Sequence, residues 1–296
     1  TADYKVNAAI GQSDKEAVYT AIFNDLKEAK AQLSENYPTA GRVRPNQFTA
    51  TALLARAYLY HKDYSNAETE ASAVIGSGLY GPLPELNGAF LKDSQEAIWQ
   101  LMPSSNLVLS TQEGYAFIGD IPSGYGPNYI LSTSLINSFE AGDGRRQAWI
   151  GTVDYQDQTY YYPFKYKDHG TYAVAPTEYY IMFRLAEQYL IRAEARAQSG
   201  KLPDAVTDVN MVRARAGLPP LQNSIDQNAL LTAIENENRH EFFAEWGHRW
   251  MDLKRTGRAD AVLSVEKTGW KPAAALFPVP QDQINLDKKL VQNPGY

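Results

Sequence analysis

The chain has 296 residues and a formal net charge of −6, with 44% apolar residues, 21% charged residues and no cysteine. This is the composition of an ordinary folded protein, with enough residues for one large domain or two smaller ones. The lack of cysteine excludes disulfides, thiolate metal ligands and a cysteine nucleophile. The acidic balance argues against nucleic acid as a partner, because phosphate backbones are bound by basic surfaces. No run of about 18 apolar residues is present to span a membrane.

In chain order, a first helix is predicted over residues 13–36, where Ser13 and Glu16 have capping-box spacing. Two short helices follow over 51–61 and 64–75, and a second pair is predicted over 185–198 and 203–216. The two pairs align without gaps, so that Ala55, Ala57, Tyr64 and Ala67 match Ala193, Ala195, Leu202 and Ala205. These are hairpins of the tetratricopeptide kind, but they lie much further apart than the roughly 34 residues of a tandem repeat.

The segment between the hairpins, 82–177, differs in composition and is rich in Gly, Pro, Ser and Tyr. A strand is predicted over 97–102 and a short helix over 130–140, with a loop-like stretch over 107–128. Extended stretches are predicted over 143–150 and 159–167. Long irregular segments on a rigid scaffold commonly carry function.

The C-terminal part begins with a helix from Asp226, preceded by capping-box spacing between Ser224 and Gln227. It leads into a segment rich in aromatic and charged residues, 234–255, which we expect to break at Gly247. The proline-containing tail from Ala275 is predicted to form an extended strap over the helices.

Four segments resemble the signature motifs of the SusD/RagB family. They are RLAEQYLIRAEA at 184–195, VRARAGLP at 212–219, EFFAEWGHRWMDLKR at 241–255, and the ending LFPVP at 276–280 with QNPGY at 292–296. The resemblance implies one mainly α-helical domain over 1–296, in which tetratricopeptide-type hairpins form an αα superhelix and a loop-rich insertion carries short β-strands. Within it, 13–80 and 178–296 would be scaffold, with the strap at the end, and 81–177 would be the ligand side.

The resemblance also implies a function. Family members are cell-surface lipoproteins of the Bacteroidetes outer membrane that bind oligosaccharides or polysaccharides and pass them to a SusC-like TonB-dependent transporter. They are not enzymes and need no cofactor, although calcium could bind an Asp-rich loop. Members are usually longer and carry a lipid-bearing cysteine, so we expect this chain to be the C-terminal part of such a protein, without its membrane anchor. A tetratricopeptide adaptor that binds a protein partner, or a glycan-degrading enzyme, are the alternatives.

A metal site is one alternative use of the aromatic and charged segment. Glu245 and His248 have the Glu-x-x-His spacing of carboxylate metal bundles, and His240 and Glu241 lie one turn earlier. Such a site needs a second motif, which the sequence lacks. The favoured interpretation is therefore structural ion pairing of the charged residues Glu241, Glu245, Arg249, Asp252 and Arg255.

Glycoside hydrolysis would need two carboxyl groups about 5 to 9.5 Å apart. Four aspartates of the insertion could supply them: Asp120, Asp143, Asp154 and Asp157. Because aspartates in loops usually form turns, catalysis is the less favoured interpretation.

Sugar binding by aromatic residues of the insertion is the favoured hypothesis, because a flat ring covers the apolar face of a pyranose while polar groups bind its hydroxyls. The predicted ligand-binding residues are Tyr115, Phe117, Tyr125 and Tyr129, with Asn106, Gln112, Asp120 and Asn128. Burial of these rings is an equally open alternative for any one tyrosine. Tyr155, Tyr160, Tyr161 and Tyr162 form a second, weaker cluster, and Trp99 and Trp149 are predicted to be core residues.

Overall fold

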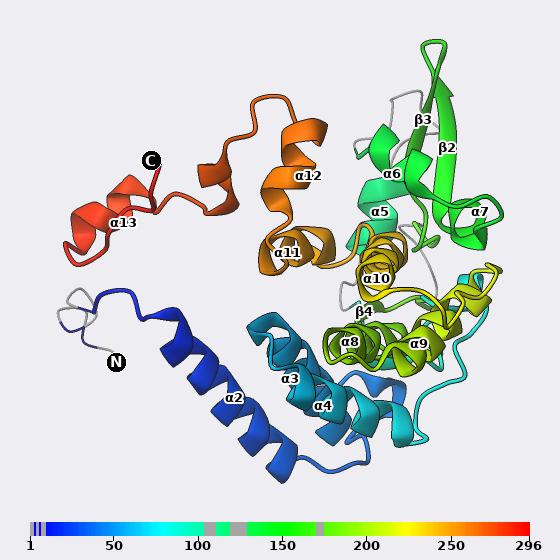
Figure 1. The fold of residues 1–296 in the computed structure, drawn as a ribbon, viewed down its shortest axis with the longest axis horizontal. Helices are drawn as coiled ribbons and strands as arrows, with labels where there is room; N and C mark the ends of the chain where they lie inside the picture. Colours follow the sequence, from blue (N-terminus) through cyan, green and yellow to red (C-terminus); the bar gives the residue numbers. More distant parts are fainter. Residues whose placement is uncertain (1–2, 4–5, 7–9, 104–110, 119–128, 170–174) are drawn as a thin grey trace. The chain divides into compact units, whose positions relative to one another are not determined.

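The computed structural model describes residues 3, 6, 10–103, 111–118, 129–169 and 175–296 (Figure 1). They form two compact units, one of residues Phe23–His248 and one of Thr1–Ile22 with Arg249–Tyr296. Within the described residues, no helix combines the length and the apolar character that crossing a bilayer requires.

The first hairpin consists of α3 (Gln47–His61) and α4 (Tyr64–Gly76), as the sequence predicts, with α3 beginning four residues earlier. Asn46 starts α3 with a capping box, accepting from the Thr49 N–H at 3.0 Å. Asp63 caps α4 in the same way, so two helices follow each other across a two-residue turn. The α2 helix (Lys15–Gln32) precedes the hairpin and is capped by Asp14 rather than by the predicted Ser13.

The second hairpin consists of α8 (Leu185–Gln198) and α9 (Leu202–Arg215), again as predicted. Its α8 packs on α4 of the first hairpin (Figure 1). Alanines at 0% exposure form much of this interface, including Ala55, Ala67 and Ala195. Small side chains allow the helix axes to lie close together, so the interrupted repeats stack as neighbours and the mainly α-helical fold is confirmed.

The insertion contains two small antiparallel sheets. One pairs β1 (Ala97–Leu101) with β4 (Tyr180–Arg184), and the other is a hairpin of β2 (Ile150–Tyr155) and β3 (Gln158–Pro163). Because β4 runs directly into α8, the first sheet joins the insertion to the second hairpin.

Three short helices also lie in the insertion: α5 (Gln112–Ile118), α6 (Thr133–Ser138) and α7 (Gly144–Trp149). Only α6 was predicted, so the expectations of a loop at 112–118 and an extended strand at 144–149 are wrong. Asp143 initiates α7 by accepting from the Arg145 N–H at 2.9 Å. A cap of this kind stabilises a helix too short to show a periodic pattern.

The α10 helix (Gln227–Phe242) is capped by Asp226 rather than by the predicted Ser224. It ends before Gly247, which has a φ of +74° that favours glycine, and the next helix is α11 (His248–Arg255). The predicted break at Gly247 is therefore confirmed.

The second unit has its own small core of Leu253, Ala259 and Leu263, flanked by Trp250 and Trp270. It contains α12 (Ala259–Glu266), the 3₁₀ turn η4 (Pro272–Ala275) and α13 (Gln281–Leu286), so the tail is not extended throughout. Two further 3₁₀ turns, η1 (Ala40–Arg42) and η2 (Leu86–Gly88), lie in the first unit. The two tail motifs meet because the Gln292 amide exchanges hydrogen bonds of 2.8 and 2.9 Å with the Val279 backbone.

Candidate functional site

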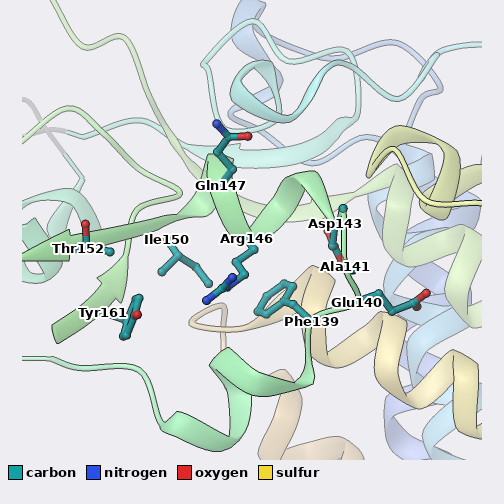
Figure 2. A pocket seen from close by; sticks show the side chains of 10 residues that line it. Phe139, Glu140, Ala141, Asp143, Arg146, Gln147, Ile150, Thr152 and Tyr161 are labelled. Carbon is teal, nitrogen blue, oxygen red and sulfur yellow. The ribbon is translucent and has the colours of Figure 1, made fainter. Parts of the chain in front are cut away.

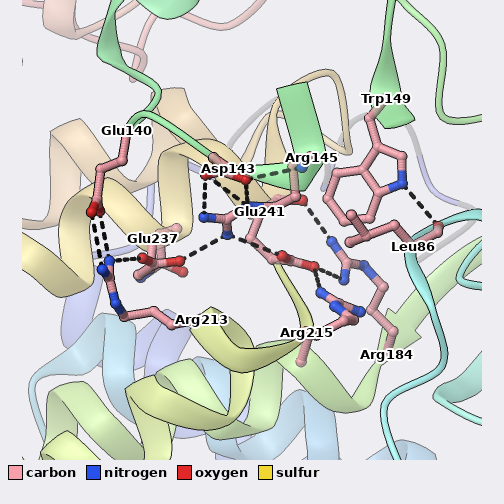
Figure 3. Close-up of polar contacts among 12 residues, drawn as sticks. Leu86, Glu140, Asp143, Arg145, Trp149, Arg184, Arg213, Arg215, Glu237 and Glu241 are labelled. Atoms are coloured by element: carbon pink, nitrogen blue, oxygen red, sulfur yellow. Dashed lines mark hydrogen bonds and ion pairs between the residues drawn. The ribbon is translucent and has the colours of Figure 1, made fainter. Parts of the chain in front are cut away.

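A buried network of charged side chains lies between the insertion and the helical hairpins (Figure 3). Arg145 of α7 contacts Asp143 at 2.7 Å and Glu237 of α10 at 2.8 Å. Arg184 binds Glu241 and also Glu245, at 2.9 Å. The network therefore connects side chains of the insertion, of the β4–α8 junction and of α10.

Two more arginines complete the network (Figure 3). Arg213 of α9 contacts Glu237 at 2.8 Å, and Arg215 contacts both Glu96, at 2.7 Å, and Glu241. Burial alone would raise the pKa of the Glu241 carboxyl, but Arg215, Arg184 and Arg145 hold it well below its usual range. Glu241 is thus an anion enclosed by three cations.

Lys165 lies beneath the insertion among aromatic rings. Burial lowers its pKa to about 8, against the opposing effect of Glu245, whose Oε1 lies 2.6 Å from Nζ. The Nζ atom also lies 4.1 Å from the centroid of the Phe243 ring. One carboxylate and several cation–π contacts hold the Lys165 ammonium in place, so we assign this lysine a structural role.

The candidate metal ligands make other contacts. Glu241 and Glu245 form ion pairs with arginines. The His240 ring stacks on Phe139, with 4.4 Å between centroids, and the His248 ring stacks on Phe242, with 4.6 Å between centroids. Across the residues that the structure describes, no group of three His, Asp or Glu side chains is arranged to hold a metal. Structural ion pairing is the arrangement that the contacts of Glu241 and Glu245 support.

The aspartates considered for hydrolysis are not brought together as a pair. Asp143 is buried against Arg145, whereas Asp154 is exposed and accepts from the Thr159 hydroxyl at 2.7 Å. Asp157 is exposed in the β2–β3 turn, with a φ of +61°, and Asp120 lies outside the described residues.

Part of the predicted sugar site forms an exposed aromatic surface. Tyr115 and Phe117 lie on α5, and the Phe117 ring meets that of Tyr129 edge to face, with 5.6 Å between centroids. Tyr115 is 46% exposed and Tyr129 is 55% exposed. The predicted residue Gln112 begins α5 and is also exposed. The other predicted ligand-binding residues, Asn106, Asp120, Tyr125 and Asn128, lie outside the described residues.

Hydrogen bonds at its first turn anchor the α5 helix. Its Gln112 N–H donates to the Tyr180 hydroxyl of β4 at 2.9 Å, and the Gly114 N–H donates to the Thr111 hydroxyl at 3.1 Å. A Cβ at position 114 would collide with the backbone carbonyl of Asp168. Glycine is therefore required here for the close approach of two backbone segments.

A cleft of about 570 Å³ lies beside this surface, between the α6–α7 turn and the β2–β3 hairpin (Figure 2). It is lined by Phe139, Glu140, Ala141, Gly142, Asp143, Arg146, Gln147, Ile150, Thr152 and Tyr161. The Leu131 N–H donates to the Tyr161 carbonyl at 2.8 Å, so the segment that follows Tyr129 runs along β3 toward the cleft. Most of the cleft-lining residues were not predicted as site residues, because the sequence gives no sign of a pocket between short elements. Tyr161 is an exception, since it belongs to the second aromatic cluster.

The remaining aromatic residues divide between core and surface. Trp149 is fully buried and donates from Nε1 to the Leu86 carbonyl at 2.9 Å, whereas Trp99 is half-buried beside Phe183. Tyr162 covers Gly151 on the opposite face of the hairpin from Tyr161. One side of this tyrosine cluster packs inward, because Tyr161 packs on the core.

Comparison with known proteins agrees with this architecture. Residues 155–296 match the model of the SusD family. SusD-like protein P2 of Formosa agariphila is 26% identical over 97% of this chain and 66% of its own length. The starch-binding protein SusD of Bacteroides thetaiotaomicron is 33% identical over 43% of this chain and 23% of its own length.

A solved structure of a laminarin-binding SusD-like protein superposes with a TM-score of 0.78 at 26% identity, covering 96% of this chain and 70% of that one. The fold is thus a scaffold of tetratricopeptide-type hairpins with a side insertion. Over residues 155–296 the chain matches the SusD family, and the whole chain spans just under two thirds of the length of SusD-like protein P2.

Proposed function

We propose that this chain is part of a non-catalytic glycan receptor, which captures oligosaccharides or polysaccharides at the outer surface of the cell and passes them to a SusC-like outer-membrane transporter. The observation that carries the proposal is the exposure of two tyrosines, Tyr115 on the anchored α5 helix and Tyr129, whose ring meets Phe117 of the same helix. Exposed rings bind the apolar face of a sugar, and an anchored helix limits the entropy lost on binding.

Two relatives support the choice of ligand, since one is described as starch-binding and the other as laminarin-binding. Catalysis has less support, because the described aspartates of the insertion are paired, exposed or in a turn rather than facing each other across a cleft.

The experiment is calorimetric titration of the chain with starch-derived and laminarin-derived oligosaccharides, together with chromatography of the mixture. We expect binding without shortened products. The substitutions Tyr115→Ala and Tyr129→Ala should each weaken binding by about tenfold, the factor that corresponds to about 1.4 kcal/mol. Tyr296→Ala removes a tyrosine of similar exposure, 53%, from the tail and serves as the control.

Unchanged affinity in both Tyr115→Ala and Tyr129→Ala would contradict this location of the site, and release of shorter sugars would contradict the non-catalytic function. Co-purification of the full-length protein with its transporter would test the proposed transfer.

A further inference from the structure

The cleft between α7 and the β2–β3 hairpin contains two acids that each bind a buried arginine. The Glu140 carboxylate receives two hydrogen bonds from Arg213, at 2.6 and 3.0 Å. The Asp143 carboxylate is bound by the buried Arg145 at 2.7 Å. Both acids therefore pair with arginines other than the one that lines the cleft.

Arg146 is that further cation. Figure 2 shows its side chain extending from α7 between Ile150 and Phe139, on the side of the cleft where Tyr161 lies. It is exposed, and its guanidinium makes no hydrogen bond or ion pair with any residue that the structure describes. The adjacent Arg145 differs completely, since it is fully buried in the ion network. The cleft thus carries one guanidinium that pairs with no residue that the structure describes.

The β2–β3 hairpin supplies an aromatic ring and hydroxyl groups to the cleft. Thr152 and Tyr161 are directly paired across the β2–β3 hairpin, so their side chains emerge on the same face, which borders the cleft. Tyr161 is half-buried on the hydrophobic core, so its ring is held in place while it still borders the cleft.

These features match an acidic sugar better than a neutral one. A ring and hydroxyls bind any pyranose, but an unpaired guanidinium gains its largest interaction from a carboxylate or sulfate, to which it donates two parallel hydrogen bonds. The volume of about 570 Å³ lies within the range of about 300–1,000 Å³ found for small-molecule sites.

We propose that this cleft binds an anionic sugar residue, a uronate or a sulfate ester, and that Arg146 selects for its charge. The proposal rests on the proposed glycan-binding function and extends it from the aromatic surface to the adjoining cleft.

The experiment compares ligands that differ only in charge. One arm uses oligogalacturonate and its methyl ester, and the other uses sulfated galactan oligosaccharides and their desulfated forms. Binding to the chain is measured by calorimetry, with Arg146→Gln as the test variant. Arg44→Gln is the control, because Arg44 is also exposed but lies outside the cleft.

In at least one arm, we expect the anionic ligand to bind the unaltered chain about five- to tenfold more tightly than its neutral counterpart. Arg146→Gln should abolish this preference while leaving affinity for the neutral form unchanged, and Arg44→Gln should retain it. The arm that shows the preference identifies carboxylate or sulfate as the preferred group.

Equal binding of charged and neutral forms in both arms, or a preference that survives Arg146→Gln, would overturn the proposal. Such a result, with neutral glycans still bound through Tyr115 and Tyr129, leaves the proposed function intact. Failure of neutral and charged glycans alike to bind would overturn both.

Discussion

Arg56 of α3 and Glu187 of α8 form a bidentate ion pair between the two helical hairpins. The Nε and Nη2 atoms of Arg56 lie 2.5 and 2.7 Å from the two carboxylate oxygens of Glu187. Arg56 also covers the Phe183 ring, 4.5 Å from its centroid. This pair joins repeats that are distant in the sequence. Burial alone would raise the pKa of the Glu187 carboxyl, but Arg56, together with His248 and Arg184, holds it below its usual value.

The Arg56–Glu187 pair should contribute measurably to stability. We expect Arg56→Met to lower the free energy of unfolding by about 2–3 kcal/mol, because the buried Glu187 loses its partner. The double variant Arg56→Met with Glu187→Leu should recover part of that loss, since no buried charge remains. Urea unfolding of the single and double variants measures the coupling, and strictly additive losses would show that the two residues do not interact.

Replacement of Glu241 should be more damaging. Glu241→Gln leaves Arg184, Arg215 and Arg145 without their shared anion, and a buried charge that loses its partner costs about 3–5 kcal/mol. The exposed Glu28→Gln is the matched control and should change the free energy by less than about 0.5 kcal/mol. Thermal unfolding followed by circular dichroism provides the comparison, and similar transitions for the two variants would contradict a central role of Glu241.

His240 should make stability depend on pH in mildly acidic solution. Burial, and next the nearby Arg145, lower its pKa to about 4. The Ser138 hydroxyl donates to the Leu135 carbonyl, so the imidazole Nε2–H donates to Ser138 and the buried Nδ1 accepts from no described side chain. A proton added to Nδ1 would therefore have no buried acceptor.

The unfolded chain has an ordinary histidine pKa of about 6.5, so it binds a proton more readily than the folded chain between these two values. His240 therefore makes its whole contribution to the free energy of unfolding above about pH 6.5. This contribution falls by up to about 3 kcal/mol as the pH is lowered toward 4. Urea unfolding from pH 7 to 4 should show this decline, and His240→Gln should flatten it. An equally steep decline in the variant would assign it to other groups.

Replacement of Gly114 by alanine should weaken glycan binding more than it destabilises the helical scaffold. Gly114→Ala introduces a methyl group against the Asp168 carbonyl and should displace α5, which carries Tyr115 and Phe117. We expect glycan affinity to fall about tenfold or more. Gly76→Ala, at the end of α4, is a glycine control with free space around it and no positive φ, and it should leave glycan affinity unchanged. Retained affinity in Gly114→Ala would show that the position of α5 does not govern binding.

The helical hairpins could be predicted because their signal is local. The spacing of alanine and apolar residues identified α3, α4, α8 and α9 with small errors at their ends. The caps of α2 and α10 were misplaced because Ser13 and Ser224 lie close to Asp14 and Asp226, which are equally good capping residues. The helices α5 and α7 were missed because seven or fewer residues make no periodic pattern.

The sequence by itself determined the family motifs, the repeated hairpins and the choice of aromatic residues as ligand-binding candidates, since each depends on residue type and short spacing. Only the tertiary structure decided which charges meet. Arg145 and Arg146 are neighbours in the chain, yet one is buried among Asp143, Glu237 and Glu241 and the other extends into the cleft. Glu237 and Glu241 lie 92 and 96 residues from Arg145 in the chain, and electrostatic contacts over such separations follow from packing rather than from local sequence.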